Sequence, residues 1–334
     1  MDNYSVDPNK LQVEELEFSK GSFSRVYKGW YLDRSVCVKV IRKDMLDPDL
    51  LVFINREIDI LKDLFSKTHK NIVEFIGVGE RESLLFLVTE LVHGGDLGSI
   101  LRDSSIQLPW LLKLHIARSI AEGMRFLHSK NIMHRDLKSN NLLVGDDWTI
   151  KICDFGFAKS LNPTSLTNTI CGTDEWMSPE VILGMPYNYS ADFYRLEERL
   201  PQNNFDIDLE ELEKIRPEEC PEEFWKLALK CCSYYPKDRP DFDSIIDSID
   251  DIITVQESVE FPPTPIIIKD PNFNDQNALE NWFMLSNLPG DILDDSFEMD
   301  NVKEESIDFS DEEKFDEEEE EEPPRSRRWY CSIC

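Results

Sequence analysis

Long apolar runs and a basic N-terminal region are both absent from this 334-residue sequence. No stretch reaches the roughly 18 apolar residues that a membrane-spanning helix needs, and Met1 to Pro8 lack the pattern of a secretory signal. The sequence also has no basic stripe, and its formal net charge of -31 repels nucleic acid. We therefore expect a cytoplasmic protein without a nucleic-acid partner.

Cysteine spacing gives no sign of disulfides or of a metal centre. The eight cysteines occur in a chain that is large enough to fold without covalent cross-links. Cys331 and Cys334 form one Cys-x-x-Cys, but no second pair stands at the spacing of a zinc site. This pattern favours reduced thiols and disfavours a zinc centre.

Acidic residues are concentrated in the last quarter of the chain. Roughly 17 of the net negative charges lie after residue 252, where the periodic apolar pattern also fades. The chain as a whole is 41% hydrophobic, which is enough for a substantial core. The composition thus predicts a globular region followed by an acidic tail.

The first part of the globular region is typical of a sheet with one helix. Short β-rich runs between residues 13 and 41 are separated by the turn-like pair Asp33 and Arg34. Apolar residues then recur at helical spacing from residue 54 to residue 65, and the apolar run over residues 84–88 suits a buried strand. We expect a small lobe built from these elements.

The following part is typical of helices. Apolar residues trace one face of a predicted long helix over residues 110–128. Two more amphipathic helices are predicted over residues 224–231 and 245–252, because the prolines between them interrupt helical backbone. The ordered domain is expected to end near residue 255.

Three different patterns follow in the tail. Residues 261–265 read Phe-Pro-Pro-Thr-Pro and predict a stiff, extended linker, whereas the acidic residues 291–322 predict disorder. Apolar residues between 279 and 288 allow either a short amphipathic helix or incidental collapse, and we favour incidental collapse.

The strongest motif runs from His134 to Asn141, reads His-Arg-Asp-Leu-Lys-Ser-Asn-Asn, and is followed by Asp-Phe-Gly at residues 154–156. The order and separation of these motifs resemble those of the eukaryotic protein kinases. The resemblance implies an α+β, two-lobed fold, in which a small lobe of sheet plus one helix precedes a larger, mainly helical lobe. It places a protein kinase domain at residues 12–255 and an acidic, mostly disordered tail at residues 256–334.

The resemblance also implies a role for each polar residue of these motifs. Asp136 would act as general base on the substrate hydroxyl, and Lys138 would lie near the transferred phosphoryl group. Asn141 and Asp154 would hold Mg²⁺, and ATP would be the phosphoryl donor. Lysine at position 138 favours serine or threonine hydroxyls of protein substrates.

In the small lobe, the resemblance assigns the phosphate-binding residues. Lys39 would bind the α- and β-phosphates, with Glu57 of the predicted helix as its partner. When the glycine-rich loop is aligned on Val26, the family's three glycines fall at Ser19, Gly21 and Ser24, so that only the central one is present. Because serine adds a Cβ and a hydroxyl near the phosphates, we expect weakened nucleotide affinity.

The adenine site and the group within the family follow from further motifs. Thr89 would lie beside the adenine pocket, Glu90 and Val92 would offer backbone hydrogen bonds, and Leu143 would form the floor. The motifs Phe-x-x-Arg-Glu-Ile, Asn-Ile-Val-x-Phe-Ile-Gly and Cys-Gly-Thr-x-x-Trp-Met-Ser-Pro-Glu look most like the tyrosine-kinase-like group of serine/threonine kinases.

Residues 156–180 match the activation segment of the family. Arg135 could pair with a phosphate on this segment, and Glu180 is expected to form a structural ion pair with Arg239. Four hydroxyl residues are candidate phosphate acceptors, among which the sequence does not choose: Thr164, Ser165, Thr167 and Thr169.

The chain departs from the family after Asp192. The segment up to Cys220 is on the order of twenty residues short, about the length of the apolar helix at the centre of the large lobe. Three explanations remain open: a shortened active kinase, a binding-only pseudokinase or scaffold, and a sequence that omits a coding segment. We favour descent from an active kinase, because the catalytic residues are intact. Either the protein product or its recorded sequence would then be truncated.

The last four residues, Cys-Ser-Ile-Cys, fit a prenylation motif at Cys331. Arg325, Arg327 and Arg328 lie just upstream, but the nearby glutamates oppose binding to an anionic membrane. Cysteine is an unusual final residue for this motif. Membrane association through a prenylated Cys331 therefore competes with a plain free tail, which we favour slightly.

Overall fold

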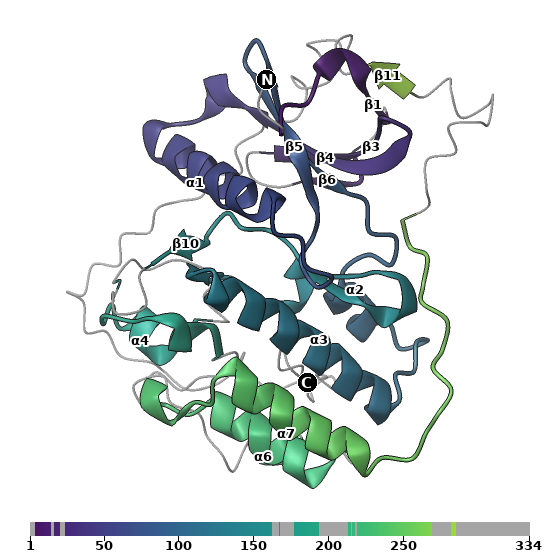
Figure 1. Ribbon diagram of the computed structural model, residues 1–334, viewed down its shortest axis with the longest axis vertical. Coiled ribbons are helices and arrows are strands. Elements are labelled where there is room, and N and C mark those ends of the chain that lie inside the picture. Colours follow the sequence, from purple (N-terminus) through teal and green to yellow (C-terminus); the bar gives the residue numbers. More distant parts are fainter. Residues whose placement is uncertain are drawn as a thin grey trace, which may run out of the picture.

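The structure is a computed structural model of the chain, and its described residues are 4–14, 17–20, 24–161, 167, 177–193, 213–214, 216–217, 219–268 and 282–284. A sheet with one long helix forms the upper lobe, and a group of helices forms the lower lobe (Figure 1). This is the two-lobed α+β arrangement that the sequence predicts.

The elements have the following bounds. The strands are β1 (Leu11–Glu14), β2 (Ser19–Lys20), β3 (Ser24–Tyr31), β4 (Arg34–Arg42), β5 (Phe75–Arg81), β6 (Leu84–Glu90), β7 (Ile132–Met133), β8 (Leu142–Val144), β9 (Ile150–Ile152), β10 (Lys159–Ser160) and β11 (Trp282–Met284). The helices are α1 (Pro48–Phe65), α2 (Leu97–Arg102), α3 (Trp110–Ser129), α4 (Pro179–Ile182), α6 (Glu222–Cys231) and α7 (Phe242–Thr254).

One antiparallel sheet forms the small lobe, in the order β11-β1-β3-β4-β6-β5 with β2 paired to β3. A two-residue turn joins β3 to β4 at Leu32 and Asp33, which have φ values of 47° and 65°. Positive φ at both positions matches the twist of paired strands. The resulting register sets Val26 opposite Lys39, and the predicted strands are confirmed.

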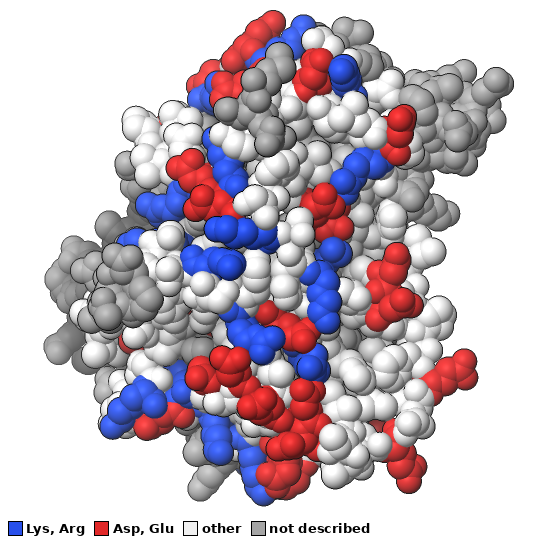
Figure 2. Space-filling view, viewed as in Figure 1, with Lys and Arg blue, Asp and Glu red and all other residues white. Residues whose placement is uncertain are grey.

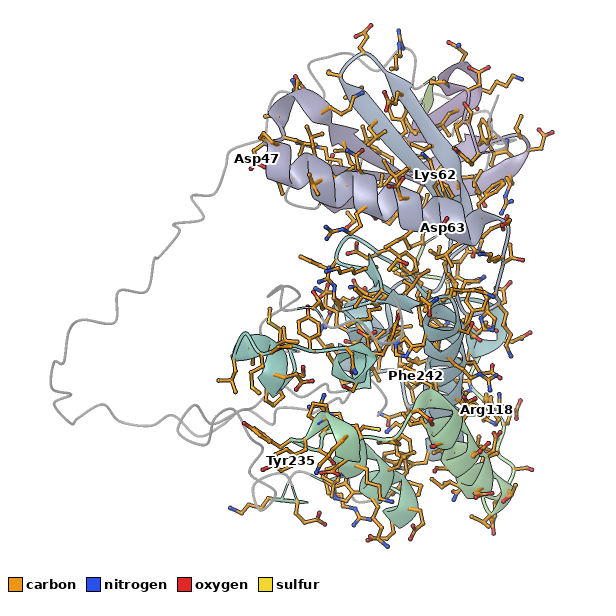
Figure 3. The ribbon with its side chains drawn as sticks, turned by 60° about the vertical axis from the view of Figure 1, so that its left-hand side comes forward. Asp47, Lys62, Asp63, Arg118, Tyr235 and Phe242 are labelled. Carbon is orange, nitrogen blue, oxygen red and sulfur yellow. The ribbon has the colours of Figure 1, made fainter. Side chains whose placement is uncertain are left out.

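Helix α1 packs one apolar face against this sheet. The helix begins after Asp47, whose side chain accepts a backbone N–H at 2.8 Å and caps the first turn. Figure 3 shows Asp47 at this end of α1 and Lys62 and Asp63 toward the other. Ile58 on the inner face is buried in the core, and the neighbouring Glu57 is buried as well.

Helix α3 runs through the large lobe and packs along α7 (Figure 1). Arg118 of α3 donates hydrogen bonds at 2.5 and 3.0 Å to the two carboxylate oxygens of Asp250 of α7. Figure 3 labels Arg118 on α3 and Phe242 at the start of α7, where Phe242 is buried. The three helices predicted from apolar periodicity are therefore confirmed as α3, α6 and α7.

The predicted ion pair between Glu180 and Arg239 is confirmed. The guanidinium donates to the two carboxylate oxygens at 2.6 and 2.8 Å, and both residues are buried. Arg239 also donates to the carbonyls of Ser190, Ser233 and Tyr234. Because its donors are satisfied in this way, a buried charge can be held here without a large desolvation penalty.

The ordered structure continues past the predicted boundary near residue 255. The sequence assigns residues 256–268 to a mostly disordered tail, but they run in extended form along the domain (Figure 1). Pro262 accepts a hydrogen bond from the Trp148 indole at 2.7 Å, and Ile267 and Ile268 donate to the carbonyl of His93. The prediction of a stiff, extended linker agrees with this path.

The structure also differs from the sequence prediction at residues 282–284. They form β11, which pairs antiparallel with β1 and sets Met284 opposite Gln12 and Trp282 opposite Glu14. The expected short helix or incidental collapse is therefore wrong for these three residues. The physical reason is that β1 would otherwise be an edge strand with unpaired backbone groups, which an added strand satisfies.

Several predictions lie outside the described residues. They concern Gly21, the shortened segment after Asp192, the hydroxyls of Thr164, Ser165 and Thr169, and the tail beyond residue 284.

The described helices include none that has both the length and the apolarity to cross a bilayer. On the face seen in Figure 2, Lys and Arg side chains lie among Asp and Glu side chains.

Candidate active site

A cavity of about 340 Å³ lies between the sheet and the helical lobe, and we call it the cleft. It brings together nearly all the residues that the sequence assigns to nucleotide and metal. Those lining it are Ser19, Ser24, Val26, Lys39, Glu57, Thr89, Glu90, Val92, Asn141, Leu143 and Asp154.

Lys39 and Glu57 form the ion pair that the resemblance implies. The Nζ atom of Lys39 lies 3.0 Å from both carboxylate oxygens of Glu57 and 3.9 Å from a carboxylate oxygen of Asp154. Burial alone would lower the pKa of Lys39, but these two carboxylates outweigh it and raise the pKa above its usual value. The ammonium therefore stays charged and ties α1 to β4.

The catalytic loop, residues 134–141, holds the candidate base. Asp136 is buried, and its Oδ2 accepts a hydrogen bond from Asn141 Nδ2 at 3.0 Å and lies 3.1 Å from Lys138 Nζ. Asn141 Nδ2 also donates to the carbonyl of Asp136 at 2.8 Å. These contacts fix the carboxylate in one orientation with an ammonium beside it.

Asn141 and Asp154 fit a Mg²⁺ site. Because the amide nitrogen of Asn141 is used by Asp136, its Oδ1 is the atom that remains for a cation. Burial would raise the pKa of Asp154, but the charge of Lys39 outweighs burial and lowers the pKa below its usual value, so the carboxylate is ionised at neutral pH. An amide oxygen and a carboxylate in one cavity are the hard ligands that Mg²⁺ prefers.

Asp192 anchors the backbone of the catalytic loop. Its carboxylate accepts hydrogen bonds from the amides of His134 at 3.0 Å and Arg135 at 2.8 Å, and it lies 3.0 Å from His128 Nε2. Arg135 has φ of 66°, a strained value for a residue with a side chain. The sequence reading treats Asp192 only as the start of a missing helix, so this role was missed.

His134 is held as a neutral imidazole. Its Nδ1 accepts from the amide of Asp136 at 3.3 Å, which leaves Nε2 to donate to the carbonyl of Cys153 at 3.1 Å. Burial lowers the pKa of His134, against an opposing effect of the Asp192 carboxylate. Protonation of Nδ1 would break the contact with the amide of Asp136.

Several residues that line the cleft are not among those that the sequence reading assigns, and Cys37 and Ile268 are two of them. Cys37 precedes Lys39 by two positions in β4, so the strand's period of two could have placed it on the same face. Burial raises the pKa of Cys37 to about 11, which keeps the thiol protonated. Ile268 also lines the cleft, and no local sequence signal points to it.

One candidate of the activation segment is described. Thr167 is buried, its hydroxyl accepts a hydrogen bond from Lys159 Nζ at 2.9 Å, and its backbone pairs with Tyr187. Arg135 donates to the carbonyl of Phe157 and to the Tyr187 hydroxyl, and its Nη2 is buried without a partner among the described residues. Arg135 therefore lies close to the segment with which it is predicted to pair.

Comparison with known families agrees with this geometry. The family model described as protein kinase domain matches residues 14–248, which is more than half of the chain. The chain therefore belongs to the protein kinase family.

Similar proteins occur in Dictyostelium discoideum. A probable serine/threonine-protein kinase is 54% identical over 322 residues, which cover 90% of this chain and 76% of that protein. The probable serine/threonine-protein kinase kinX is 40% identical over 270 residues, covering 74% and 24% of the two chains. The RasGEF domain-containing serine/threonine-protein kinase X is 38% identical over 262 residues, covering 72% and 27%. The chain thus spans about a quarter of the last two proteins.

The neutral state of His134 predicts how stability depends on pH. Its folded-state pKa is lowered, so below about pH 6.5 the unfolded chain binds a proton that the folded chain resists, and stability falls as the pH decreases. We expect urea denaturation to give a larger free energy of unfolding at pH 7.5 than at pH 5.5. This difference should shrink in His134→Phe, whereas an unchanged difference would contradict the assignment.

Proposed function

We propose that the protein is an ATP-dependent serine/threonine kinase of the tyrosine-kinase-like group, with Mg²⁺ as cofactor. The observation that carries this proposal is the convergence of Lys39, Asn141 and Asp154 on one cleft, with the carboxylate of Asp136 bonded to Asn141. The names of the relatives support serine and threonine as acceptors. Lys138, two residues after Asp136, agrees with this specificity.

The side chains divide the work of phosphoryl transfer. Mg-ATP would supply the γ-phosphoryl group and the charge neutralisation that its transfer needs. Lys39, held by Glu57, binds phosphate oxygens and fixes their position. Asp136 accepts the proton from the substrate hydroxyl as that oxygen bonds to phosphorus, and ADP leaves with the electrons of the broken P–O bond. Lys138 lies beside Asp136 and stabilises negative charge there.

A catalytically impaired pseudokinase or scaffold is the second candidate. It is motivated by Ser19 and Ser24, which stand near the cleft where the family prefers glycine, and by the shortened large lobe. Nucleotide binding without turnover would distinguish this candidate.

Substitution of the candidate base separates the two functions. Asp136→Asn removes the proton acceptor while keeping the shape of the side chain, so phosphate transfer from γ-labelled ATP to a generic protein substrate should fall about 100-fold to 10,000-fold. Asp33→Asn is the matched control, because Asp33 is exposed at a turn that asparagine also adopts. Equal activity of the two variants, or none in the folded unaltered chain, would reject the kinase proposal.

We further propose a role in intracellular signalling on protein substrates, with a cytoplasmic location. Membrane association through a prenyl group on Cys331 is the alternative for the tail, motivated by its Cys-Ser-Ile-Cys ending. A single prenyl chain needs a second signal for stable binding, and the three upstream arginines could supply it.

The state of the C-terminus is directly measurable. If Cys331 is prenylated, the C-terminal peptide from eukaryotic cells should carry a prenyl mass on Cys331 and lack the three residues that follow it. Cys331→Ser should abolish this modification and move the protein from the membrane to the soluble fraction. An unmodified peptide ending at Cys334 would eliminate the idea.

A further inference from the structure

The chain returns from the large lobe to the cleft after α7. In Figure 1 the green extended stretch leaves the end of α7 and rises along the side of the molecule toward the sheet. Its last part, residues 261–268, is called the tail segment below. Residues 256–268 have no helix or strand of their own, so their position depends on contacts with the rest of the domain.

The first contacts are with the large lobe. The Phe261 ring meets the His115 ring edge to face, with 5.6 Å between centroids. The indole N–H of Trp148 donates to the carbonyl of Pro262 at 2.7 Å, and the Trp148 amide donates to the Thr264 hydroxyl at 3.2 Å. Trp148 is itself buried, so the tail segment is held by a fixed part of the core.

The last contacts are beside the adenine end of the cleft. The amides of Ile267 and Ile268 both donate to the carbonyl of His93, at 2.9 and 2.8 Å. The Ile267 side chain lies over Gly95, where a Cβ would approach within 3.2 Å of Ile267 Cδ1. Ile268 is half-buried and lines the cleft together with Val26 and Leu143.

Two features favour a stable docked state. The three prolines of the tail segment restrict its backbone before docking, which lowers the entropy lost on ordering. Farther along the chain, β11 pairs with β1 in the small lobe, so the chain is attached on both sides of residues 269–281. The tail segment is therefore attached to the large lobe, and the chain beyond it is attached to the small lobe.

We propose that the tail segment is part of the nucleotide site and that the Ile268 side chain forms an apolar wall against the adenine ring. This inference rests on the proposed function, because it names a further specificity-determining residue of the same cleft. Val26 and Leu143 supply further aliphatic surfaces, and a purine ring between such surfaces loses water from its faces. Docking of the tail segment and binding of the base therefore favour each other.

Titration calorimetry on the full chain tests this role with three probes: Mg-ATP, adenosine and Mg-tripolyphosphate. Ile268→Ala should raise the Kd for Mg-ATP and for adenosine about threefold to tenfold, because part of one buried aliphatic surface is lost. The Kd for Mg-tripolyphosphate should not change, since this probe has no base. Ile266→Ala is the matched control, because Ile266 is 71% exposed.

The outcomes separate the two proposals. Unaltered chain that binds neither Mg-ATP nor adenosine would overturn the kinase proposal together with this one. Normal binding by the unaltered chain, with equal affinities for Ile268→Ala and Ile266→Ala, would overturn only the role of Ile268. A matching loss of tripolyphosphate affinity would also contradict it, because the effect would then concern the whole site.

Hydrogen exchange tests the coupling itself. The amides of Ile267 and Ile268 exchange when the tail segment leaves His93, so saturating adenosine should slow their exchange severalfold in the full chain. The amides of α7 serve as the internal reference, because no residue of this helix lines the cleft and α7 lies at the bottom of Figure 1. Unchanged exchange at Ile267 and Ile268 under saturating adenosine would contradict the coupling.

Discussion

The buried carboxylate of Asp192 is the constraint on which the catalytic loop depends. Its side chain has no exposed surface, and an ionised group in that position has to be hydrogen bonded on both oxygens. The amides of His134 and Arg135 meet this need, and they hold Arg135 at its strained φ of 66°. The next residue, Asp136, receives its position from this anchor.

The rest of the site extends from the same loop. Asn141 bonds back to Asp136, and the carbonyl of Asn141 accepts from the amide of Cys153, the residue before Asp154. Asp154 in turn faces Lys39 of the small lobe at 3.9 Å. A continuous chain of contacts therefore runs from Asp192 to the ion pair that positions α1, and both lobes contribute to one cleft.

Sequence reasoning predicted the parts that depend on local patterns. Helices such as α3 follow from apolar periodicity, and Asp136, Asn141 and Asp154 follow from motifs of fixed spacing. It did not predict contacts between distant segments. The pairing of Met284 with Gln12 joins residues far apart in the chain, and three residues are too few to show a strand's alternation. The run of isoleucines that ends at Ile268 likewise does not predict that Ile268 lines the cleft.

The role of Asp192 as the anchor of the catalytic loop is tested most directly by the kinetic effect of Asp192→Asn. Asparagine keeps one acceptor oxygen, but its amide group faces a backbone N–H, so one anchor of the catalytic loop is lost. We expect kcat to fall about 100-fold through misplacement of Asp136, while the Kd for Mg-ATP stays within twofold. An unchanged kcat, or an equal loss of nucleotide affinity, would contradict this role.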